Sequence, residues 1–192
     1  MRKIVQMLVV LCMVLMSTQV VFANADKVTI AEGADITTVH RMAVAAPLYT
    51  PIKGAPGKDA VTKLVYDASS VARGYVISYD MVAQNIQKDK NIDILHLDRR
   101  QASQAFKDNV ASYADAYVVM TVANNSRTVF FFDVYKAGTN ELLYTYEIAA
   151  NRSDPDTVAA YTTLVQQFYK NFDRSAEAQQ KDHEKAANSK HK

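Results

Sequence analysis

The sequence predicts a single α/β domain of the α+β kind, with a mixed sheet of about five strands that ends in an antiparallel meander and is packed by three helices. Three β-rich runs, 116–122, 128–135 and 142–148, are joined by short polar segments of the kind that form hairpins. Apolar residues at helical spacing occur before and after these runs. About 150 residues remain when the two ends of the chain are set aside, which is one domain of ordinary size.

The first half of the domain is predicted as strand, loop, helix, strand and helix. Residues 39–47 hold a short apolar run that stops at a proline, which indicates a buried strand, and the Pro- and Gly-rich segment 48–59 is a loop. A helix is expected from Asp67, because apolar residues then recur every three or four positions. Residues 92–97 are predicted to be the next strand, and Asp98 the N-cap of a short helix. The apolar faces of the two helices are Val71, Tyr75, Tyr79, Val82 and Ile86, and then Ala102, Ala105, Phe106 and Val110.

Alternation along the meander predicts that one face packs on helices and the other is partly wet. Asp154 and Pro155 are expected to open the last helix. Its apolar face is predicted to hold Val158, Tyr161, Leu164 or Val165, Phe168 and Phe172. The expected organisation is therefore a flexible lead-in at 26–38, the α/β domain at 39–173, and a polar tail at 174–192 that is a helical extension or disordered.

Residues 1–25 have the three parts of a secretory signal peptide. Two basic residues precede an apolar run, and Ala23 and Ala25 form a small-residue cleavage motif. We expect cleavage after Ala25, with Ala23 as the second choice. The rival interpretation is a membrane anchor, which needs about 20 apolar residues, whereas polar residues 17–19 interrupt this run. We expect no stable membrane span after cleavage.

Cys12 is the only cysteine, and it lies in the middle of the apolar run without the small preceding residue of a lipidation site. We therefore expect no lipid anchor. The cleaved chain would have no disulfide and no thiolate metal site. Small secreted domains often depend on disulfides, so this favours a bacterial periplasm or cell envelope, and otherwise an extracellular location.

The charge balance argues against nucleic acid as a partner. The chain has 22 basic and 20 acidic residues, and without Arg2 and Lys3 the two numbers are equal. A nucleic-acid-binding domain normally carries a basic excess that neutralises phosphates.

Three short segments resemble a group of bacterial envelope domains. They are 94–99 (ILHLDR), 114–119 (ADAYVV) and 132–143 (FDVYKAGTNELL). With the element order, they resemble the periplasmic domains of the curli-secretion lipoprotein and the penicillin-binding-protein activator lipoprotein, and the related amino-terminal domain of TolB, over residues 39–172. The resemblance implies a noncatalytic periplasmic domain that docks onto partners or oligomerises. The chain departs from the group because it lacks a lipidated cysteine and a transmembrane hairpin.

No pattern in the sequence predicts a catalytic, cofactor-binding or metal-binding residue. The glycines at 54 and 57 are too close together for a phosphate loop, and no serine lies in a nucleophile-elbow pattern. His40, His96 and Asp98 would form a metal or hydrolase site only if the fold brought them together, and we favour ordinary structural roles for them. Asp115 and Asp133 lie on adjacent predicted strands and could act as an acid–base pair. We favour the alternative, in which both are solvent-facing charges on a half-wet sheet.

The sequence is rich in tyrosine, with 11, and several lie on the meander. Tyrosine is common at protein interfaces, so this cluster could bind a partner. The alternative hypothesis, which we favour, is that the tyrosine rings form a core and only their hydroxyls lie at its rim. Asp98 and Arg99 would bind a partner or would simply cap and flank a helix. The candidate partner-binding residues are Tyr117, Tyr135, Tyr144, Tyr146, Asp98 and Arg99.

The function predicted from these features is that of an exported, noncatalytic cell-envelope domain that binds another envelope protein or a second copy of itself. The alternative is a periplasmic module that binds a small molecule or a lipid in a pocket between the meander and the helices.

Overall fold

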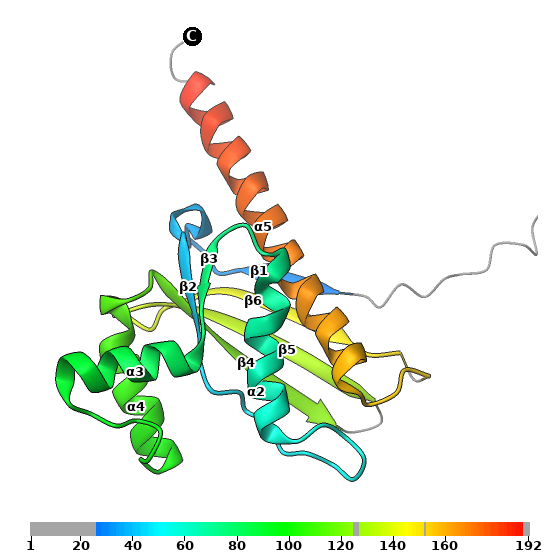
Figure 1. Cartoon of the computed structure of the whole chain (residues 1–192). Coiled ribbons are helices and arrows are strands. Elements are labelled where there is room, and N and C mark those ends of the chain that lie inside the picture. The colour runs from blue at the N-terminus through cyan, green and yellow to red at the C-terminus, as the bar shows by residue number, and fades with distance from the viewer. Residues whose placement is uncertain (1–25, 125–126, 152, 190–192) are drawn as a thin grey trace, which may run out of the picture.

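The protein is a mixed α/β domain built on one open six-stranded sheet (Figure 1). The computed structural model describes residues 26–124, 127–151 and 153–189, so the predicted signal peptide lies outside the described residues. The strands are β1 (Lys27–Ile30), β2 (Arg41–Val44), β3 (Tyr75–Ile77), β4 (Ala116–Asn124), β5 (Thr128–Lys136) and β6 (Leu142–Ala149). The α-helices are α2 (Lys58–Asp67), α3 (Tyr79–Lys90), α4 (Arg99–Asn109) and α5 (Val158–Ser189). Three short 3-10 helices are η1 (Ile36–Thr38), η2 (Ala68–Val71) and η3 (Val110–Ser112).

The strands run in the order β1-β6-β5-β4-β2-β3. The antiparallel meander β4-β5-β6 is as predicted, because alternation of buried and half-buried residues along these strands is a strong signal. β2 pairs in parallel with both β4 and β3, and β1 pairs antiparallel with β6. The two ends of the sheet are therefore β1, from the start of the described chain, and the short β3.

Each face of the sheet has its own core. On one face α2 and α5 pack over the sheet around Phe132 and Phe168 (Figure 1). On the other face α3 and α4 cover only the part formed by β3, β2 and the first half of β4, around Phe106 and Tyr117. The rest of that second face, which includes Phe131 on β5, is partly exposed. The expectation of a half-wet meander agrees with this arrangement.

The predicted helix that begins at Asp67 is wrong. Its supposed apolar face belongs to three elements, because η2 ends at Val71, β3 covers residues 75–77 and α3 starts at Tyr79. Ala72 is extended, and the chain bends at Arg73 and Gly74. A three-residue strand is too short to show a period of its own, so the helical spacing across the break was coincidental.

The predicted strand at residues 92–97 is also wrong. This segment is a loop between α3 and α4 that starts from Asn91, a left-handed C-cap with φ of 56°. Ile94 is buried in the second core, so the segment is apolar because one side chain anchors the loop and not because it joins the sheet. Asp98 caps α4 as expected: its Oδ1 accepts from the N–H groups of Arg100 and Gln101.

Several boundaries differ from those predicted. Residues 26–38, predicted as a flexible lead-in, contain β1, which pairs with β6, and η1, which packs against α5. The sheet has six strands where about five are predicted. A fourth helix, α2, follows Gly57. The last helix starts at Val158, not at Asp154, because the carboxylate of Asp154 accepts from Asn151 N instead. The hydroxyl of Thr157 caps this helix by accepting from Ala160 N.

Candidate functional site

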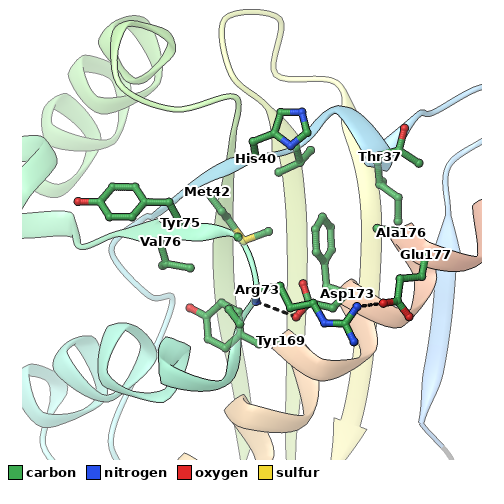
Figure 2. A pocket seen from close by; sticks show the side chains of 15 residues that line it. Thr37, His40, Met42, Arg73, Tyr75, Val76, Tyr169, Asp173, Ala176 and Glu177 are labelled. Atoms are coloured by element: carbon green, nitrogen blue, oxygen red, sulfur yellow. Dashed lines mark hydrogen bonds and ion pairs between the residues drawn. The ribbon is translucent and has the colours of Figure 1, made fainter. Parts of the chain in front are cut away.

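A pocket of about 380 Å³ opens between the start of β2, the start of β3 and the middle of α5 (Figure 2). Three separate stretches of chain line it, and none is close to the others in sequence: residues 36–42, residues 72–76, and one side of α5 from Tyr169 to Glu177. The pocket therefore lies at the β3 edge of the sheet, on the face that α5 covers. We take this pocket as the candidate functional site.

The floor of the pocket is apolar and firmly held. Met42, Val76 and Phe172 line it and are buried. Tyr169 lies beside them and donates its hydroxyl to Val65 O at 2.8 Å, so that its ring is fixed against the pocket wall. These side chains belong to the main core, which means that the floor is a rigid surface and not a flexible flap.

Backbone contacts between distant segments shape the mouth of the pocket. The carboxylate of Asp115 accepts from His40 N at 3.0 Å and from Arg41 N at 2.8 Å, which fixes the start of β2. Tyr75 N donates to His40 O at 3.0 Å. A Cβ at position 74 would lie 3.3 Å from His40 O, so Gly74 allows β3 to begin close to β2.

The charged groups are gathered on the α5 side of the pocket, while Tyr75 lies on the opposite side (Figure 2). The guanidinium of Arg73 pairs with Glu177, and Arg73 N donates to Asp173 Oδ2 at 3.0 Å. Burial raises the pKa of Asp173, against the opposing effects of the Arg73 N–H and the Arg73 charge. The carboxylate of Asp173 is thus only partly compensated by its surroundings.

Three of the candidate tyrosines are core residues. Tyr117, Tyr144 and Tyr146 are at most 1 % exposed, because their strand positions face the two cores. Burial raises the pKa of Tyr117 and of Tyr144 to about 12. The hydroxyl of Tyr117 reaches Asn140 Oδ1 and that of Tyr146 reaches Asp26 Oδ2. The hydroxyl of Tyr144 is buried without a hydrogen-bond partner among the described residues. A role for these three tyrosines in partner binding stays a prediction.

The other three candidates remain on the surface, away from the pocket. Tyr135 is partly exposed and stacks on Tyr117, with ring centroids 5.4 Å apart. Asp98 and Arg99 are exposed at the start of α4. None of these residues lines the pocket. A role for them in partner binding stays a prediction.

The structure does not bring His40, His96 and Asp98 into one site. His40 lines the pocket, whereas His96 lies in the loop before α4, with its Nδ1 2.7 Å from Asp93 Oδ2. Within the described part of the chain, no group of three or more histidine, cysteine or carboxylate side chains is placed to hold a metal ion. The hydrolase hypothesis, which required these side chains to converge, is wrong.

Three polar residues distinguish the pocket and are not among those predicted from the sequence: Arg73, Asp173 and Glu177. Arg73 follows a turn inside the wrongly predicted helix, and nothing local marks it. Asp173 and Glu177 are four residues apart just beyond Phe172, the last residue of the apolar face of α5. Here the carboxylates follow the apolar stripe of the helix at the same helical spacing. Such a pattern is a weak signal that this face of the helix extends beyond the core and lines a site.

No family model matches the sequence, and no curated protein matches it. Among solved structures, the fold is similar to the LpoB C-terminal domain from Escherichia coli, with 14% sequence identity and a TM-score of 0.44 over 59% of this chain and 84% of that one. It is also similar to the PelC dodecamer from Paraburkholderia phytofirmans, with 10% identity and a TM-score of 0.38 over 74% of this chain and 93% of that one.

LpoB is a penicillin-binding-protein activator lipoprotein, a kind of protein to which a resemblance is predicted from the sequence. At these identities and TM-scores, the likeness concerns the course of the chain alone and says nothing about a ligand of this protein. In the described ranges, no helix has both the length and the apolar character needed to cross a membrane.

Proposed function

We propose that this protein is an exported, noncatalytic cell-envelope domain that binds an extended segment of another envelope protein, or of a second copy of itself, at the edge formed by β3. The sequence supports export through the signal-peptide pattern at residues 1–25. The geometry supports binding through one observation: the pocket of about 380 Å³ lies directly beside an edge strand.

An edge strand can accept one more strand. Tyr75 N donates toward β2, so the N–H and C=O groups of Gly74 and Val76 point to the open side of β3. A partner segment would pair with these groups and place alternate side chains over the pocket, which is a common mode of peptide recognition. Tyr75, which is 59% exposed, adds a large amphipathic surface at the same edge.

Site-specific photocrosslinking in intact cells of the host tests this proposal. A photoreactive phenylalanine analogue in place of Tyr75 is expected to give a discrete crosslinked protein. The same analogue at Val158, which is 44% exposed at the far end of α5, is the matched control and is expected to give none. At Leu95, 51% exposed in the loop before Asp98, it tests the surface that the sequence predicted.

The outcomes separate the possibilities. A specific product at position 75 alone supports binding at β3. A product at position 95 alone moves the partner surface to the start of α4 and contradicts the site proposed here. If no position yields a product at native expression, the role in protein binding is contradicted.

A second candidate function is a small-molecule carrier. The volume and apolar floor of the pocket fall in the range of ligand pockets. Native mass spectrometry of the protein released from the envelope is the test: a stoichiometric added mass that disappears on extraction with organic solvent would favour this function over partner binding.

A further inference from the structure

The pocket carries a net negative charge. Besides two tyrosines, its lining residues with titratable side chains are Arg73, Asp173, Glu177 and His40. The Arg73 guanidinium pairs with Glu177, which leaves these two charges largely balanced. His40 is exposed at the mouth and belongs to the opposite wall from α5. Asp173 is therefore the charge in the pocket that no cationic side chain pairs with directly among the described residues.

Asp173 has room for a further donor. Its Oδ2 accepts from Arg73 N at 3.0 Å, and across the described ranges its Oδ1 accepts no hydrogen bond. The raised pKa of Asp173 also indicates an undercompensated carboxylate. Burial disfavours its charged form by more than the N–H and the charge of Arg73 favour it. A cationic donor in the pocket would supply the missing compensation.

The strand register directs a partner side chain to this place. Met42 and Val76 are neighbours across β2 and β3, and both face the core side of the sheet, where α5 lies. Side chains of directly paired residues point to the same face of a sheet. The partner residue that pairs beside Val76 would therefore direct its side chain over the apolar floor toward α5.

We propose that the pocket takes a lysine or arginine side chain of the segment bound along β3, with the aliphatic stem on Met42, Val76 and Phe172 and the charged head at Asp173 Oδ1. Long basic side chains commonly bury the stem on apolar surface while the head reaches a polar group. The inference rests on the proposed function, since the segment along β3 delivers the side chain.

An acidic side chain fits the same place poorly. It would have to break the pair between Arg73 and Glu177 to reach the guanidinium, and it would then lie beside Asp173. An uncharged apolar side chain would cover the floor but leave the Asp173 carboxylate less solvated than before. A basic side chain alone satisfies both the floor and the carboxylate.

Three pentapeptide probes test the inference: acetyl-Val-Thr-Lys-Thr-Val-amide and its analogues with norleucine or glutamate at the centre. Titration into 15N-labelled protein in its exported form, followed by amide chemical shifts, measures each affinity. The lysine peptide is expected to shift the amides of residues 73–77 and 173–177 and to bind at least tenfold more tightly than the norleucine peptide at low salt. The glutamate peptide is expected to bind most weakly.

Two variants locate the preference. Asp173→Asn keeps an oxygen for Arg73 N, so the fold is retained, and it is expected to remove the preference for lysine over norleucine. Asp182→Asn is the matched control, because Asp182 lies farther along α5, pairs with Lys185 and does not line the pocket; it is expected to keep the full preference.

Each outcome is decisive. Equal binding of the lysine and norleucine peptides at residues 73–77 would overturn the proposal that the pocket takes a basic side chain. The proposal that a segment adds to the sheet at β3 would still stand. A preference that survives Asp173→Asn would overturn the role of this carboxylate. If no peptide shifts these amides, the inference is overturned, while crosslinking at position 75 still decides the proposed function independently.

Discussion

Asp115 shows how one residue joins the start of β2 to the start of β4. Its Oδ2 accepts from His40 N and Arg41 N, and Arg41 Nη2 lies 3.3 Å from Oδ1. Burial by itself would raise the pKa of Asp115, but the backbone donors of Arg41 and His40 and the Arg41 charge together lower it below its ordinary value of 3.8. The folded state therefore favours the ionised carboxylate, which means that this group stabilises the fold.

Replacing Asp115 with alanine is expected to lower the free energy of unfolding by about 1 to 3 kcal/mol at pH 7, because two backbone donors lose a charged acceptor. Since the folded pKa is depressed, this contribution exists above the unfolded pKa and is lost as the pH falls through the folded one. Urea unfolding of both proteins at pH 7 and pH 2.5 checks it. Asp108→Asn, at an exposed site on α4, is the control. An equal difference at the two pH values would contradict the prediction.

Asp173 is predicted to behave in the opposite way. Its folded pKa is raised, so the stability that it contributes is present below the unfolded pKa and is lost as the pH rises through the folded one. Asp173→Asn removes this loss. We therefore expect the variant to gain stability relative to the wild type between pH 3 and pH 7 in thermal unfolding, and a relative loss over that range would contradict the assignment.

At the scale of elements, α5 joins the two ends of the described chain. Gln179 accepts from Ile36 N through Oε1 at 2.9 Å and donates to Ala34 O through Nε2 at 2.7 Å. The side-chain amide thus replaces a strand partner for the loop between β1 and β2. Residues 174–189, which the sequence presents as a polar tail, continue the helix and contribute the wall of the pocket.

Gln179→Ala is expected to lower the free energy of unfolding by about 1 to 2 kcal/mol, because it leaves two partly buried backbone groups without a partner. Gln180→Ala is the matched control on the next, exposed position, where the amide bonds only Glu184, and it should stay within about 0.5 kcal/mol of the wild type. Equilibrium denaturation measures both. Similar values for the two variants would show that the amide does not hold the loop.

The elements that the sequence predicts well are those with a long regular pattern. The meander strands are eight or nine residues long, and the face of α5 from Tyr161 to Phe172 repeats over several turns. The parallel strands β2 and β3 are only four and three residues long, so no period can show. The pocket could not be predicted, because Arg73 and Asp173 lie 100 residues apart in sequence and meet only through the packing of α5 on η2.

At the scale of the whole molecule, aromatic side chains fill the larger core. Phe168 lies at its centre and stacks on Phe132, with ring centroids 4.5 Å apart and an angle of 6° between the ring planes. Tyr144, Tyr146, Tyr169 and Phe172 surround it. The abundance of tyrosine is thus explained largely by the core, where the rings are buried. The hydroxyls of Tyr146 and Tyr169 reach Asp26 and Val65 O, whereas that of Tyr144 is buried without a hydrogen-bond partner among the described residues.

Phe168→Ala is expected to cost about 3 to 5 kcal/mol, because it removes a fully buried ring and leaves a cavity between the sheet and α5. Val158→Ala, at an exposed position on the same helix, is expected to change stability by less than about 0.5 kcal/mol. Guanidinium denaturation, followed by far-UV circular dichroism, compares them. A cost below about 1 kcal/mol at position 168 would mean that the core relaxes around the missing ring.

The hydrogen bonds between Gln179 and the loop after β1 span more than 140 residues. A chain that leaves a ribosome or a membrane channel in order presents β1 first, yet β1 pairs with β6, and the loop after it bonds both Leu143 O and Gln179 of α5. Native closure of the sheet must therefore wait until nearly the whole chain has emerged. Such long-range closure slows folding, so the sheet becomes compact only after β6 and α5 are available to β1 and its loop.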